Sequence, residues 1–140
     1  MAEMTFAARG TSKSVEEGDR LMPKFDAAGL ITAVAVDHKT KDILMVAHMN
    51  EEALKKTIAT NEAWYWSRSR NALWHKGDTS GQIQTVHEIR IDCNQDCLML
   101  IVSVAGDGGC CHTGRRDCFY RRIDGVDAAG EVKLVLRSSH

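Results

Sequence analysis

The stretch LITAVAVDHKTKDILMVAHM, residues 30–49, contains two apolar runs separated by a short polar segment. The first run, Leu30 to Val36, is rich in the β-branched residues that favour strands, and the second extends from Ile43 to Met49. The intervening residues, Asp37 to Asp42, have the polar character of a turn. This stretch therefore predicts a β-hairpin and places a sheet at the centre of the fold.

A helix is expected directly after the hairpin. Asn50 can act as its N-cap, Glu51 and Glu52 place negative charge in its first turn, and the helical pattern ends near Asn61. Further strands are predicted over residues 64–66, 86–91, 98–104 and 118–123, and residues 132–136 are expected to close the sheet. Several strands with few helices indicate an α+β fold with a mostly antiparallel sheet.

The length of 140 residues fits a single domain. Residues 1–20 are poor in large apolar side chains, so we expect a flexible arm, or an arm that docks on a partner, ahead of a domain over residues 21–140. The formal net charge of -1 argues against binding nucleic acid through bulk electrostatics. The chain has no signal-peptide or membrane-span pattern, which predicts a cytoplasmic protein without a membrane partner.

All five cysteines lie between Cys93 and Cys118, among aspartate, arginine and histidine residues. In a reducing compartment such a cluster favours metal binding or catalysis over disulfides. Thiolates and histidine are typical zinc ligands, and five thiols allow either a structural site with four ligands or a catalytic site with three. Cys97 opens an apolar run, which favours an ordinary buried thiol over a metal ligand. Because adjacent side chains on an extended backbone point to opposite faces, Cys110 and Cys111 are not both expected to bind one ion.

Five segments carry a resemblance to a known family: HMNEEAL (48–54), AWYWSRSR (63–70), LWHKGDTSG (73–81), IDCNQDC (91–97) and CHTGRRDCFYRR (111–122). In this order they closely resemble the phosphoribosyl-AMP cyclohydrolases of histidine biosynthesis. The resemblance implies hydrolytic opening of the adenine ring of N1-(5-phosphoribosyl)-AMP at the C6–N1 bond, the third step of that pathway. It also implies an intertwined homodimer with one zinc ion per subunit, bound by three cysteines contributed across the dimer interface, and a magnesium site.

Carried over by motif, the expected zinc ligands are Cys93, Cys111 and Cys118, which leaves Cys97 and Cys110 as bystanders. The subunit that supplies each ligand is left open at this point.

The expected magnesium motif departs from the family pattern. The family usually reads Asp-Cys-Asp-x-Asp, and here the middle carboxylate is replaced by Asn94. We expect Asp92, Asn94 and Asp96 to alternate along an extended segment, with their oxygens on one face and Cys93 on the other. Because an amide oxygen brings no negative charge, magnesium is expected to bind more weakly than it would with aspartate. A solvated acidic turn is the alternative.

The implied reaction needs a hydroxide equivalent and a proton transfer. A zinc-bound water is the expected nucleophile, although three thiolates weaken the acidifying effect of the ion. His112 follows the expected ligand Cys111 and has an ordinary pKa near neutrality, so we expect it to transfer the proton. The alternative is a histidine that only braces the loop.

The implied nucleotide substrate carries two 5′-phosphates, and three groups of residues can bind them. Trp74 can stack on the base, although aromatic residues at strand spacing are more often core residues, and lone arginines are more often solvated. The expected substrate-binding residues are Lys76, Thr79, Ser80, Gly81, Arg115, Arg116, Trp74, Ser67 and Arg68, with Ser69 and Arg70 beside the last pair.

Two other classes of protein fit the sequence less well. A zinc-stabilised nucleic-acid binder is disfavoured by the pI near 6.6 and by the absence of a finger spacing. A thiol redox protein is disfavoured because the chain has no CxxC pair and adjacent cysteines form a poor reversible disulfide.

Overall fold

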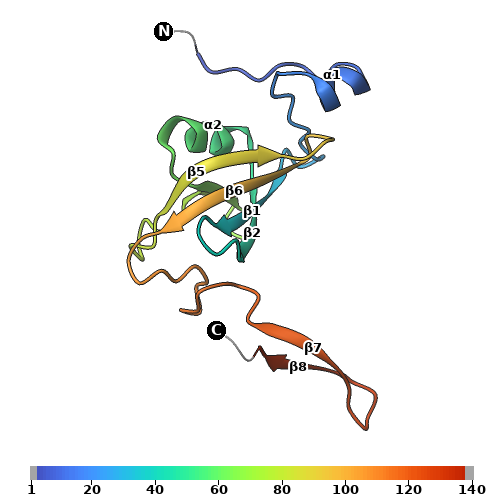
Figure 1. The fold of residues 1–140 in the computed structure, drawn as a ribbon, viewed down its shortest axis with the longest axis vertical. Helices are drawn as coiled ribbons and strands as arrows, with labels where there is room; N and C mark the ends of the chain where they lie inside the picture. The colour runs from blue at the N-terminus through green and yellow to red at the C-terminus, as the bar shows by residue number, and fades with distance from the viewer. Residues whose placement is uncertain (1–2, 138–140) are drawn as a thin grey trace.

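The computed structural model describes residues 3–137 and has a four-stranded sheet at its centre, in the order β2-β1-β6-β5 (Figure 1). The strands are β1 (Ile31–Asp37), β2 (Ile43–Met49), β5 (Gln84–Ile91) and β6 (Cys97–Val104). β1 pairs antiparallel with β2, and β5 with β6, whereas β1 and β6 run parallel. The hairpin expected within residues 30–49 is confirmed.

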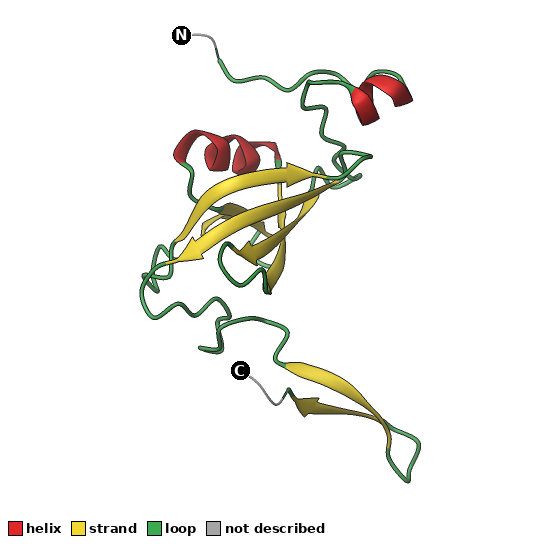
Figure 2. Ribbon diagram, in the orientation of Figure 1, coloured by secondary structure: helices red, strands yellow, loops and turns green. Residues whose placement is uncertain are grey.

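Some of the remaining elements pack near this sheet, and others extend away from it (Figure 2). Two short hairpins each form a separate two-stranded sheet. With mostly antiparallel strands and two helices among the described residues, the α+β class is confirmed. These elements are α1 (Ser12–Glu17), α2 (Glu51–Thr60), β3 (Trp64–Ser67), β4 (Ala72–His75), β7 (Arg121–Val126) and β8 (Val132–Leu136).

Helix α2 begins and ends where its sequence signals predict. The Asn50 side chain accepts a hydrogen bond from the Ala53 N–H at 2.8 Å, which satisfies one of the free donors of the first turn. Glu51 and Glu52 lie in that turn, where the helix dipole favours negative charge. Asn61 ends the helix in the left-handed conformation, with φ of 57°.

One face of the sheet forms the core. Alternate residues of β1, including Ala33 and Ala35, are fully buried, and Leu98 and Leu100 of β6 lie beside them. Helix α2 and the β3–β4 hairpin cover this face with residues such as Leu54 and Tyr65. The Tyr65 hydroxyl donates to Gln84 Oε1 at 2.6 Å, so this buried phenol has the polar partner it requires.

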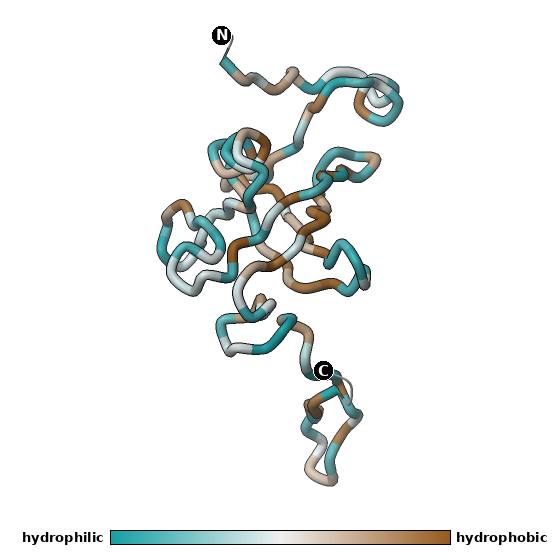
Figure 3. The backbone as a smooth tube through the Cα atoms, turned by 60° about the vertical axis from the view of Figure 1, so that its left-hand side comes forward, coloured by the Kyte–Doolittle hydropathy of each residue, from teal (hydrophilic) through white to brown (hydrophobic). Residues whose placement is uncertain are grey.

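The opposite face of the sheet and the β7–β8 hairpin are less covered. Val46 and Met99 are 46% and 37% exposed on the sheet. The hairpin extends away from the body (Figure 1), and its residues Ile123 and Leu134 are 72% and 54% exposed. Figure 3 shows the corresponding hydrophobic stretches of backbone outside the central body. An isolated two-stranded hairpin is marginally stable in water.

The N-terminal arm contacts the turn between β5 and β6. Arg9 Nη1 donates to the carbonyl oxygens of Met22 and Asn94, at 2.8 and 3.1 Å. Gln95 Nε2 donates to the Val15 carbonyl oxygen at 2.8 Å, and Gln95 Oε1 accepts from the Met22 N–H. The arm was assigned no fold from sequence, and it contains the short helix α1. Docking of the arm on a second copy stays a prediction.

Three expectations about strands are corrected. Residues 132–136 do not close the main sheet, because β8 pairs only with β7. β7 starts at Arg121 rather than at Cys118, since the Cys118 N–H instead donates to the Leu44 carbonyl oxygen at 2.8 Å. β4 was not expected, and it pairs with β3 through the hairpin of residues 64–75.

Within residues 3–137, the helices are too short and too polar for any of them to span a membrane.

Candidate active site

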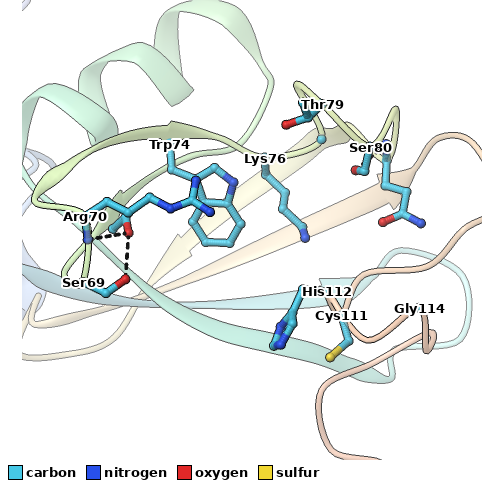
Figure 4. A pocket seen from close by; sticks show the side chains of 12 residues that line it. Ser69, Arg70, Trp74, Lys76, Thr79, Ser80, Cys111, His112 and Gly114 are labelled. Atoms are coloured by element: carbon cyan, nitrogen blue, oxygen red, sulfur yellow. Dashed lines mark hydrogen bonds between the residues drawn. The ribbon is translucent and has the colours of Figure 1, made fainter.

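A cavity of about 750 Å³ lies between the β3–β4 hairpin, the following loop and the cysteine-containing loop (Figure 4). Its volume is in the range typical of small-molecule sites. Nine residues that the sequence indicated line it, together with residues that the sequence did not single out. The lining consists of Ser67, Ser69, Arg70, Trp74, Lys76, Gly77, Thr79, Ser80, Gln82, Cys111, His112 and Gly114.

The loop after β4 is a tight turn in which one position accepts only glycine. Gly77 has φ of +89°, and a Cβ atom there would lie 2.2 Å from the Ile83 nitrogen. The turn leaves the Thr79 and Ser80 side chains exposed at the cavity. Gln82 Nε2 donates to Asp107 Oδ1 at 2.6 Å, which ties this loop to the segment before the cysteines. Gly77 and Gln82 are lining residues that sequence reasoning missed, although the glycine-rich run after a strand was a signal.

Lys76 is a buried cation, only 6% exposed. Its ammonium donates to the Cys110 carbonyl oxygen at 2.6 Å and lies 5.2 Å from the centre of the Trp74 ring. No carboxylate within residues 3–137 forms an ion pair with it. A buried charge is costly unless an opposite charge compensates it. Lys76 therefore favours an anion in the cavity, either a thiolate or a ligand.

Cys110 and Cys111 are adjacent but have different surroundings. Both backbone N–H groups donate to the Arg115 carbonyl oxygen, at 3.1 and 3.0 Å, which folds the loop tightly. The Cys110 thiol belongs to the core, and its sulfur accepts from Gln84 Nε2 at 3.1 Å. Cys111 lines the cavity instead, and the Thr113 hydroxyl donates to its sulfur at 3.1 Å. Only one of the two thiols therefore faces the site.

The acid–base properties of Cys111 and Cys118 are coupled. Burial opposes ionisation of Cys111, but hydrogen bonds from Thr113 and Cys118, with the charge of Lys76, outweigh it and hold the pKa of Cys111 below its ordinary value. Burial and the neighbouring Cys111 raise the pKa of Cys118 to about 12. Cys111 is thus easier to ionise than an ordinary thiol, and it is hydrogen-bonded to Cys118, which is harder to ionise.

His112 lies beside Cys111, and its imidazole reaches the cavity (Figure 4). In the same view the side chains of Lys76 and Arg70 extend over the cavity from the β3–β4 side. A thiol and an imidazole from the cysteine loop and two cationic side chains from the β3–β4 side therefore line one cavity.

The other expected arginines do not line this cavity. Arg116 donates to Asp42 Oδ2 at 2.7 Å and to the Thr40 hydroxyl at 2.9 Å, so it braces the β1–β2 turn. The Arg115 guanidinium stacks 4.2 Å from the centre of the Tyr120 ring. Arg68 lines a neighbouring groove. Gly81 belongs to the loop after β4 but is not among the lining residues.

The segment from Asp92 to Asp96 is a turn, which corrects the expectation of an extended strand. Asp92 Oδ1 accepts from the N–H groups of Asp96 and Cys97, at 2.9 and 3.1 Å, and Gln95 has φ of 55°. The side chains of Asp92 and Asp96 also contact each other, and the hydrogen bond with Asp92 raises the pKa of Asp96. The alternation of Asp92, Asn94 and Asp96 on one face therefore does not occur.

The three expected zinc ligands do not meet within one chain. Cys93 is exposed in the turn before β6, and Cys111 and Cys118 follow β6. β6 contains eight residues, so it separates the two ends by about 25 Å at the usual rise per residue. Figure 1 shows the turn and the loop at opposite ends of the sheet. Among residues 3–137, no group of three or more His, Cys, Asp or Glu side chains is placed to hold a metal ion.

The Cys111 thiol, the His112 imidazole, the Lys76 ammonium and a hydroxyl-bearing loop line one cavity, and such a convergence of reactive groups is typical of an enzyme active site. Comparison with known proteins gives the family. The model of the family described as Phosphoribosyl-AMP cyclohydrolase matches residues 45–120. A phosphoribosyl-AMP cyclohydrolase of Brucella abortus (strain S19) is 59% identical over 128 residues, covering 91% of each chain. That of Bradyrhizobium diazoefficiens is 60% identical over 124 residues, covering 89% of this chain and 86% of the relative. The chain belongs to the phosphoribosyl-AMP cyclohydrolase family, and the expected class of enzyme, a hydrolase of a cyclic amidine, is confirmed.

Proposed function

We propose that this enzyme opens the adenine ring of N1-(5-phosphoribosyl)-AMP by adding water at C6, the third step of histidine biosynthesis. The observation that carries the proposal is the position of Cys111 and His112 on the cavity that Lys76, Thr79 and Ser80 also line. Family membership supplies the substrate class. The five free thiols suit a reducing compartment, and the proposal places the enzyme in the cytoplasm.

The donor set of the cavity fits a zinc ion. Cys111 and Cys118 are in contact, Cys111 has a lowered pKa, and the buried ammonium of Lys76 favours negative charge beside them. Thiolates are soft ligands that suit zinc. When bound there by three cysteines and a water molecule, zinc would supply a water of increased acidity.

The third thiolate, Cys93, would come from a second copy of the chain. Because Cys93 lies at the far end of β6, a complete set of Cys93, Cys111 and Cys118 requires two subunits. A twofold dimer would contain two such sites, each with Cys93 of one subunit and the Cys111–Cys118 pair of the other. The exposed apolar residues on the open sheet face and on the β7–β8 hairpin supply the kind of surface that an intertwined dimer buries.

His112 would act as the general base. It would accept a proton from the attacking water as the new C–O bond forms at C6, and it would return this proton to N1 as the C6–N1 bond breaks. The second proton of the water would pass from the C6 hydroxyl to the exocyclic nitrogen, which becomes the amide NH2 group. The products of this bond breaking are a carboxamide at C6 and an amidine that retains N1. Lys76 would stabilise the negative charge that develops on the oxygen at C6.

Trp74 would stack on the purine, and the hydroxyls of Thr79 and Ser80 would bind one 5′-phosphate with Arg70. Arg115 and Arg116 are not proposed as phosphate ligands within their own subunit, because both are engaged elsewhere.

The magnesium site would lie at the β5–β6 turn. Asp92 and Asp96 are in contact there and can offer carboxylate oxygens to a hard cation, with Asn94 as a neutral ligand. We expect weak binding, and titration of the Asn94→Asp variant with magnesium tests this. Equal affinity of the two proteins would exclude Asn94 as a ligand.

The proposed reaction is tested by the ultraviolet spectrum of N1-(5-phosphoribosyl)-AMP mixed with reduced, zinc-loaded protein. A matched sample is stripped of metal with a chelator. Conversion of the adenine chromophore to an imidazole carboxamide only in the zinc-loaded sample is the expected result. No conversion in a sample with confirmed bound zinc would contradict the proposal.

A further inference from the structure

A second cavity, about 540 Å³ in volume, lies between strand β2 and the β3–β4 hairpin. We call it the β2-edge groove. Its polar and aromatic lining residues are His48, Trp66, Ser67, Arg68, Ser69 and Trp74.

The β2-edge groove adjoins the active-site cavity. Ser67, Ser69 and Trp74 line both cavities. Only the first cavity contains Cys111 and His112. A ligand whose reacting atom lies near these residues can therefore extend past Trp74 into the groove.

The charges of the groove favour an anion. Arg68 has no ion pair or side-chain hydrogen bond within residues 3–137, and none of the described groove residues is acidic. Burial and, next, the charge of Arg68 hold the pKa of His48 below its ordinary value. Asp26 acts on His48 in the opposite direction, but its carboxylate already accepts hydrogen bonds from the N–H groups of Ala28 and Leu30. A bound anion would offset the positive charge of Arg68 and would favour protonation of His48.

The groove also offers neutral donors. Ser67 and Ser69 carry hydroxyls, and their oxygens lie 3.4 Å apart. β2 is an edge strand of the four-stranded sheet, so part of its backbone polar groups faces away from β1 toward this side. An arginine with hydroxyl and backbone N–H donors is the combination that binds a phosphate monoester.

We propose that the β2-edge groove binds the 5′-phosphate of the ribosyl group attached at N9 of the substrate, with Arg68 as its main ligand and His48 as a further contact. This inference rests on the proposed function. C6 is bonded to N1 and must lie near Cys111 and His112, so the N1-linked ribosyl phosphate remains in the first cavity. N9 lies on the opposite side of the purine, and its substituent extends toward the more distant groove.

The test compares AMP with adenosine, because AMP carries only the N9-linked phosphate. Binding of both is measured by calorimetry for the zinc-loaded wild type, Arg68→Met and Lys39→Met. Lys39→Met is a charge-matched control, since Lys39 is exposed on the β1–β2 turn and lines neither cavity. We expect the wild type and Lys39→Met to bind AMP more tightly than adenosine. In Arg68→Met the affinity for AMP should fall at least about tenfold, with adenosine unchanged.

Equal binding of AMP and adenosine by the wild type, or equal losses in the two variants, would overturn the assignment of the groove. The proposed function is judged separately by turnover of the wild type. If the wild type does not convert the substrate but AMP binding depends on Arg68, the assignment of the groove is supported and the proposed reaction is refuted. If turnover is normal and Arg68→Met leaves KM unchanged, the groove assignment is wrong and the reaction stands.

Discussion

The ammonium of Lys76 donates a hydrogen bond to the carbonyl oxygen of Cys110 at 2.6 Å, which fixes a buried positive charge beside the thiol of Cys111. The contact joins the strand-following loop of residues 76–82 to the cysteine loop, 34 positions later in the chain. We propose on this basis that Lys76 acts electrostatically on the Cys111 thiol, whereas the sequence predicts a phosphate contact.

Lys76→Met should weaken zinc binding by about 10–100-fold, because it removes the charge that favours thiolates while keeping a similar volume. Competition with a chromophoric chelator measures this. Thermal unfolding of the metal-free protein is the control, since loss of a buried charge should not lower its stability. Unchanged zinc affinity would contradict the electrostatic role.

His112→Gln should lower kcat by about 10²–10⁴-fold with zinc content unchanged, because the amide cannot accept the proton. Turnover and metal content are measured on the same preparation. Near-normal turnover with bound zinc would remove His112 from the mechanism and leave it as a residue that braces the loop.

Cys110→Ala and Cys111→Ala form a matched pair. Cys110 is buried in the core and accepts from Gln84, so its truncation should cost about 1–3 kcal/mol in the free energy of unfolding and leave zinc bound. Cys111→Ala should lose zinc with a smaller effect on the stability of the metal-free protein. Denaturant unfolding and metal analysis distinguish the two variants, and loss of zinc from Cys110→Ala alone would reverse the assignment.

Arg68→Met should raise the pKa of His48, because it removes a nearby positive charge that disfavours protonation. The shift is partial, since burial is the larger cause of the lowered value. In the wild type, His48 binds a proton more readily in the unfolded chain than in the folded protein. His48 therefore lowers the free energy of unfolding as the pH falls through 6.5. The loss should be smaller in Arg68→Met. Titration of the His48 ring protons by NMR measures the pKa, and an unchanged value would show that Arg68 does not face His48.

Local signals predicted much of this fold. The β1–β2 hairpin and the Asn50 cap of α2 depend on neighbouring residues, and both form as expected. The parallel pairing of β1 with β6 depends on contacts between segments about sixty residues apart, which no local pattern encodes. Neighbouring residues also could not predict the position of Arg116. It was expected to bind phosphate, but it contacts Asp42, which is 74 positions away in the chain.

The candidate site also has features that local sequence predicted and features that depend on distant parts of the chain. Trp74, Lys76, Thr79 and Ser80 were expected at one site with the pair Cys111–His112, and they all line one cavity. The turn at Asp92 was misjudged as extended, because Gln95 adopts a left-handed conformation and binds the N-terminal arm through its side chain. The distance between Cys93 and Cys111 could not be predicted from local sequence, because it depends on the length and direction of β6.

The most direct test of a shared active site is to mix two variants, Cys93→Ser and Cys111→Ser, and to assay conversion of N1-(5-phosphoribosyl)-AMP. Each variant alone should be inactive, because every site in its dimer lacks one ligand. After unfolding, mixing and refolding with zinc, half of the dimers should be mixed, and each would contain one intact site. The account predicts recovery of about one quarter of wild-type activity per chain. No recovery, with mixed dimers confirmed by mass spectrometry, would contradict a site built from two subunits.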